Sequence, residues 1–76
     1  MAARQIARAV EGAIASLPQE YRQALELREM EGLSYEEIAG LTDVPVGTVR
    51  SRIFRAREAI AAKVGPLLEH RSGKRW

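Results

Sequence analysis

The positions of proline and glycine divide the chain into four helical segments. Pro18 and Pro45 suit the first turn of a helix, where a backbone N–H has no partner to lose. Gly32 suits a left-handed residue after a helix end, and Gly65 followed by Pro66 predicts the end of another helix. We therefore expect four helices, at about residues 4–15, 18–31, 35–42 and 45–64.

The last two segments have the layout of a helix-turn-helix, in which a short helix, a tight turn and a longer helix follow one another. Ser34 and Glu37 form a capping box, with Ser34 as the N-cap and Glu37 at the third helical position. Asp43 follows the short helix at a turn position, where aspartate tolerates a positive φ. Small Ala39 lets the two helices approach, and Val44 is expected to fill the turn. The expected fold is an all-α, four-helix domain whose third and fourth helices form the helix-turn-helix.

Apolar residues recur at helical spacing in each segment. The expected inner stripe of the last helix consists of Val49, Ile53, Ala56 and Ile60. The first three segments carry Ile6, Val10, Ala13, Ile14 and Leu17, then Tyr21, Ala24, Leu25 and Leu27, then Ile38, Ala39 and Leu41. Arg28 lies on the flank of the second stripe, where it either covers the core with its aliphatic stem or reaches an anion.

A chain of 76 residues allows one small domain with a thin core. We expect a single domain over residues 1–76, with its core at about 12–68 and a flexible tail at 69–76. The sequence has no cysteine and one histidine, so we expect no metal site, no cofactor and no enzymatic activity. No apolar run approaches the roughly 20 residues that span a bilayer, and no signal peptide is recognisable. We therefore expect a cytoplasmic protein without membrane insertion.

Charge is distributed unevenly along the chain. Residues 1–43 contain four basic and eight acidic residues, whereas residues 44–76 contain eight basic and two acidic residues. This asymmetry indicates that the second half contacts a polyanion. Between residues 44 and 57 no acidic residue separates the arginines Arg50, Arg52, Arg55 and Arg57. Uncompensated arginines on one helix repel one another, which favours an anionic partner over a merely solvated face.

The outer face of the last helix carries side chains that suit the major groove of DNA. Gly47 and Ser51 are small, so this end of the helix can enter a groove. Phe54 is the sole phenylalanine and is expected to point outward, where it can pack on a thymine methyl group. Arginine paired with guanine is the commonest specific base contact, and recognition helices read bases from their N-terminal part. The expected partner is therefore double-stranded DNA.

Three stretches of the sequence resemble region four, the C-terminal DNA-binding domain of bacterial sigma factors, and most closely the extracytoplasmic-function, sigma-E-like group. They are LPQEYRQAL (17–25), EGLSYEEIA (31–39) and VPVGTVRSRIFRAR (44–57), within a resemblance that covers about residues 12–68. The resemblance implies recognition of the promoter −35 element, contact with the flap of the RNA polymerase β subunit, and sequestration by an anti-sigma factor. The family's other domain, which contacts the −10 element, has no counterpart here, so the chain is expected to be part of a longer protein.

The resemblance also implies which residues touch DNA. It implies base contacts from Arg50, Ser51, Phe54 and Arg55. It implies backbone contacts from Arg28, Tyr35, Pro45, Gly47 and Thr48, to which we add the neighbouring arginines Arg52 and Arg57.

Two other functions stay open at this point. A stand-alone helix-turn-helix regulator would normally form a dimer, and a protein-interaction module would bind chiefly the polymerase or an anti-sigma factor. The stripe of the first helix is expected in the core, or partly, with Met30, on a polymerase-binding surface. Tyr21 is expected in the core or on a partner surface rather than in a ligand site.

Overall fold

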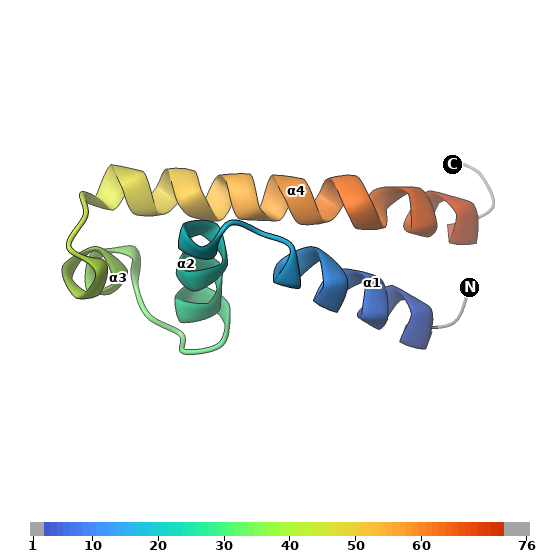
Figure 1. Cartoon of the computed structure of the whole chain (residues 1–76), viewed down its shortest axis with the longest axis horizontal. Helices are drawn as coiled ribbons and strands as arrows, with labels where there is room; N and C mark the ends of the chain where they lie inside the picture. Colours follow the sequence, from blue (N-terminus) through green and yellow to red (C-terminus); the bar gives the residue numbers. More distant parts are fainter. Residues whose placement is uncertain (1–2, 73–76) are drawn as a thin grey trace.

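The computed structural model describes residues 3–72, with side chains described for residues 3–68. It contains the helices α1 (Ala3–Ala15), α2 (Gln19–Glu29), α3 (Tyr35–Thr42) and α4 (Val46–Ser72) (Figure 1). Apart from the end of α4, the boundaries lie within two residues of the expected ones, and the all-α fold with its helix-turn-helix of α3 and α4 is confirmed. Within residues 3–72, no helix is both long enough and apolar enough to cross a bilayer.

The long helix α4 is the element on which the other three helices pack. Figure 1 shows α3 below the N-terminal end of α4, α2 below the rest of its N-terminal half and α1 below its C-terminal half. α4 contacts all three, and α2 also contacts α3. The 27 residues of α4 correspond to about 40 Å of helix, which is nearly the full 43 Å length of the molecule. One face of α4 is therefore covered along its length, while its opposite face stays open.

The buried core lies where α2, α3 and α4 meet. Ile38 of α3 is fully buried, and Val49 and Ile53 of α4 are each 1% exposed. The other buried members of this cluster are Leu17, Ala24, Leu25 and Ala56, with Tyr21, Leu27, Ala39, Val44 and Ile60 packed against them. The expected stripes of α2 and α4 are confirmed, as are the close approach at Ala39 and the packing of Val44.

Four apolar residues that were expected in the core, in two helices, are only partly buried or exposed. In α1, Ala13 is buried, whereas Ile6, Val10 and Ile14 are only half-buried. Leu41 of α3 is 66% exposed. Each of these two short helices has a single buried side chain, because each packs mainly on one face of α4.

α4 does not end near Val64, as Gly65 and Pro66 predict, but continues to Ser72. This prediction was wrong. A proline within a helix costs roughly 3 kcal/mol, but packing of α4 against another helix can offset a cost of this size. Val64 is 6% exposed, and α1 packs along this half of α4. Of the expected tail, residues 69–72 have helical backbone, and residues 73–76 lie outside the described part of the chain.

Both ends of α3 have the local structure that the sequence predicts. The Glu37 N–H donates to Ser34 Oγ at 3.0 Å, and the Ser34 N–H donates to Glu37 Oε1 at 2.8 Å. At the other end, Asp43 adopts a left-handed conformation with φ 59°, and the Val44 N–H donates to the Ala39 carbonyl at 3.1 Å. Gly32, in the loop before α3, also has a positive φ of 71°. These contacts fix where α3 starts and where the chain turns into α4.

Replacing Ser34 with alanine is expected to lower the free energy of unfolding by about 0.5–2 kcal/mol, because the Glu37 N–H loses its acceptor. Urea denaturation followed by circular dichroism measures this change. Ser34→Asp, which keeps an acceptor at the N-cap, should retain most of the stability. An equal loss in both variants would show that the side-chain acceptor at the N-cap is not what stabilises α3.

Candidate nucleic-acid interface

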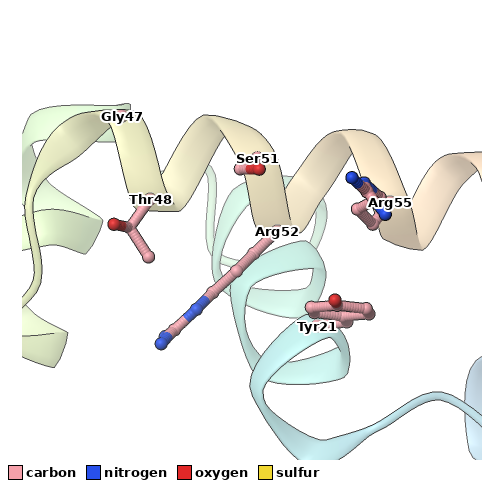
Figure 2. A pocket seen from close by; sticks show the side chains of 6 residues that line it. All are labelled: Tyr21, Gly47, Thr48, Ser51, Arg52 and Arg55. Atoms are coloured by element: carbon pink, nitrogen blue, oxygen red, sulfur yellow. The ribbon is translucent and has the colours of Figure 1, made fainter.

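The outer face of the N-terminal half of α4 is open to solvent. Phe54 is 63% exposed, which confirms the expected outward direction, and Arg50, Ser51 and Arg55 are exposed as well. Figure 2 shows Ser51 and Arg55 on the same side of α4. Val49, Ile53 and Ala56 occupy the opposite, buried side. All four side chains expected to contact bases are therefore accessible together on one helix.

The start of α4 leaves room for a partner to approach. Pro45 and Gly47 are exposed, and Thr48 and Arg52 are half-buried on the side of α4 that faces α2. A Cβ atom added at Gly47 would meet nothing within 4 Å. The space in front of Gly47 is therefore open to a ligand.

Tyr35 brings together arginines from two different helices. The Cζ atom of Arg28, from α2, lies 4.8 Å from the centroid of the Tyr35 ring, and the Cζ atom of Arg50, from α4, lies 5.7 Å from it. Both distances fall within the roughly 6 Å over which cation–π attraction is significant. Arg28 also donates from Nη1 to the Leu33 carbonyl oxygen at 2.9 Å. Arg28 is thus anchored to the loop between α2 and α3, beside Arg50.

Arg57 has an ionic partner that its own helix does not reveal. Its Nη2 is hydrogen-bonded and ion-paired to Glu29 Oε2 at the end of α2, and both side chains are about half exposed, at 52% and 53%. This hydrogen bond raises the pKa of the Arg57 guanidinium above its usual value, with further raising contributions from the Glu29 charge and from Tyr35. The expectation of an uncompensated arginine was wrong for Arg57, because the compensating carboxylate comes from another helix.

A groove of about 460 Å³ lies between the first turn of α2 and the N-terminal half of α4 (Figure 2). Its lining consists of Tyr21, Gly47, Thr48, Ser51, Arg52 and Arg55. The lining therefore includes two guanidinium groups and three hydroxyl groups, and none of these described residues is acidic. Sequence reasoning did not place Tyr21 here, because no local pattern relates the second helix to side chains about 30 positions further along the chain.

Two further grooves have a more apolar lining. One, of about 340 Å³, lies between α1 and α2 and includes Ile14 and Met30, which is 72% exposed. The other, of about 310 Å³, lies on the C-terminal half of α4 and includes Ile60, Val64 and Leu68. Exposed apolar surface of this kind is typical of protein contacts.

The comparisons with known proteins agree with this geometry. Residues 7–60 match the family model "Sigma-70, region 4". The chain is 69% identical over 55 residues to the ECF RNA polymerase sigma-E factor of Escherichia coli (strain K12), covering 72% of this chain and 29% of that protein. It is 54% identical over 68 residues to the ECF RNA polymerase sigma-E factor of Haemophilus influenzae, covering 90% of this chain and 36% of that protein.

The chain thus spans about a third of the length of these curated relatives. The family match includes α3, the turn after it and the outer face of the N-terminal half of α4 up to Arg57. A family model that matches well over half of the residues, together with the arrangement of α3 and α4, assigns this chain to the sigma-70 region 4 family.

Proposed function

We propose that the chain is the promoter-recognition domain of an alternative sigma factor of the extracytoplasmic-function, sigma-E type. It reads the −35 element of a promoter in double-stranded DNA for transcription initiation by RNA polymerase. The observation that carries this proposal is the outer face of α4, where Phe54 is 63% exposed next to Ser51 and Arg55 and opposite a fully buried stripe.

Base recognition and backbone contact fall to different side chains in this proposal. Arg50, Ser51, Phe54 and Arg55 face base edges in the major groove, where a guanidinium can pair with guanine and an aromatic ring can pack on a thymine methyl group. Phosphate groups are contacted by Arg28, Tyr35, Pro45, Gly47, Thr48, Arg52 and Arg57. Such contacts set the register of the protein on the duplex without reading sequence.

Selection from a random duplex pool at low salt, with the 76-residue chain, tests the proposal. We expect enrichment of one asymmetric sequence, because one region 4 domain presents one recognition helix. A palindromic preferred site together with a dimer in sedimentation would support a stand-alone regulator instead. Failure to select any sequence, combined with tight binding to polymerase or to an inhibitor protein, would support a protein-interaction module.

Replacing Arg28 with alanine is expected to weaken binding to all duplexes alike. The slope of log K against log salt should flatten by about 0.9, since one phosphate contact is lost. Fluorescence anisotropy titrations at several salt concentrations measure this slope. Arg28→Lys keeps the charge while losing the planar group that lies over Tyr35, so its slope should match the original. An unchanged slope in Arg28→Ala would remove Arg28 from the backbone contacts.

The proposed sigma factor also binds proteins: the β flap of RNA polymerase and an anti-sigma factor. The exposed Met30 and the apolar grooves beside α1 and along the C-terminal half of α4 support such contacts. If an inhibitor covers the arginine face of α4, DNA and inhibitor should compete in anisotropy titrations, whereas a ternary complex would contradict simple occlusion. We assign no catalytic step to the domain and place its action in the cytoplasm, with the chromosome.

A further inference from the structure

The groove between α2 and α4 has the composition of a phosphate-binding site. Two guanidinium groups, from Arg52 and Arg55, supply positive charge, and Tyr21, Thr48 and Ser51 supply hydroxyl donors. Phosphate oxygens are acceptors that pair well with guanidinium and hydroxyl groups. No acidic side chain belongs to the described lining, so nothing within the groove competes with an incoming anion.

The polar side chains of this groove have no partner within the described part of the protein. Tyr21, Thr48, Ser51, Arg52 and Arg55 make no side-chain hydrogen bond, ion pair or ring contact with residues 3–68. Polar groups that protein atoms leave unpaired are satisfied by water or by a ligand. Of these five groups, Tyr21, Thr48 and Arg52 are not assigned to bases, so their donors are available to a single phosphate.

On the other flank of α4, the arginines already have partners within the protein. There Arg50 lies over the Tyr35 ring, and Arg57 is paired with Glu29. The arginines of that flank are held by the protein itself, whereas Arg52 and Arg55 are available. The groove beside the first turn of α2 is thus on the flank of α4 whose arginines have no partner among residues 3–68.

Tyr21 is well placed to supply a fixed donor. Its ring is half-buried and packs against the core cluster, so binding would not have to immobilise a free side chain. Figure 2 shows the ring projecting from α2 into the space below Arg55, on the side of α4 to which Thr48 and Arg52 also extend.

We propose that this groove holds one phosphate of the DNA backbone, and that the Tyr21 hydroxyl donates a hydrogen bond to it beside Thr48 and Arg52. The inference rests on the proposed function, since the phosphate belongs to the duplex whose bases face Ser51 and Arg55. It extends the DNA interface to α2, a helix outside the helix-turn-helix.

Tyr21→Phe tests the contact, because it removes the hydroxyl and keeps the ring that packs on the core. We expect binding to the selected duplex to weaken about ten- to hundredfold, as for loss of a hydrogen bond to a charged group. The salt slope should stay unchanged, because the hydroxyl carries no charge, while Arg52→Gln should flatten it by about 0.9. Ser16→Ala removes a hydroxyl at the contact between α1 and Lys63 and should leave DNA binding unchanged.

A scan with single methylphosphonate substitutions, each of which neutralises one phosphate, identifies the group that is bound. The original chain should lose affinity at each contacted phosphate, and at one of these positions Tyr21→Phe and Arg52→Gln should cause little further loss. Equal binding by Tyr21→Phe and the original chain would overturn the contact, as would a defect that persists at every neutralised position. In both cases specific binding by the original chain leaves the proposed function intact, whereas a chain that binds no duplex would overturn both.

Discussion

Replacing Arg55 with alanine should weaken binding to the selected duplex by about 1–3 kcal/mol and relax the preference at one base pair. Arg55 is exposed on the outer face of α4 and has no side-chain partner in residues 3–68, so its fork of donors is available for a guanine. For the same reason, the free energy of unfolding should change by less than about 0.5 kcal/mol. Anisotropy titrations against duplexes with each base pair changed in turn measure both affinity and preference.

Arg8→Ala is the matched control for Arg55→Ala. Arg8 is also exposed but lies on α1, which packs below the C-terminal half of α4. Arg8→Ala removes the same charge far from the recognition face, so only a small, sequence-independent loss of DNA affinity is expected. If Arg55→Ala weakened the selected and the scrambled duplexes equally, Arg55 would be a backbone contact rather than a base contact.

Replacing Ile38 with alanine should lower the free energy of unfolding by about 2–5 kcal/mol, because it leaves a cavity in a well-packed core. Ile38 is the only buried side chain of α3 and is 0% exposed. A domain of this size has a total stability of about 4–11 kcal/mol, so a large fraction would be lost. Urea denaturation measures the loss, and DNA binding should fall in proportion to the unfolded fraction.

Leu41→Ala, on the same helix, is the control for Ile38→Ala. Leu41 is 66% exposed, so its truncation should change stability by less than about 0.5 kcal/mol. Similar losses in the two variants would mean that α3 is not held against α4 through Ile38. Together with Arg55→Ala, this pair separates loss of DNA binding through a missing contact from loss through unfolding.

Local rules were sufficient for most of the fold. Ser34 and Glu37 form the expected capping box, Asp43 adopts the expected positive φ, and Phe54 faces outward. Each of these features depends on residues within about one helical turn, where capping geometry and apolar periodicity act. The local rule failed at Pro66, through which α4 continues to Ser72 in the half that packs on α1.

The sequence by itself determined where the helices start, which face of α4 is buried and which face carries the expected base contacts. Only the tertiary structure decided that Glu29 pairs with Arg57, that Tyr35 lies near both Arg28 and Arg50, and that Tyr21 joins the groove beside Arg52. The physical reason is distance along the chain. Caps and periodic stripes are set by neighbours, whereas ion pairs and grooves between helices arise only after packing brings distant side chains together.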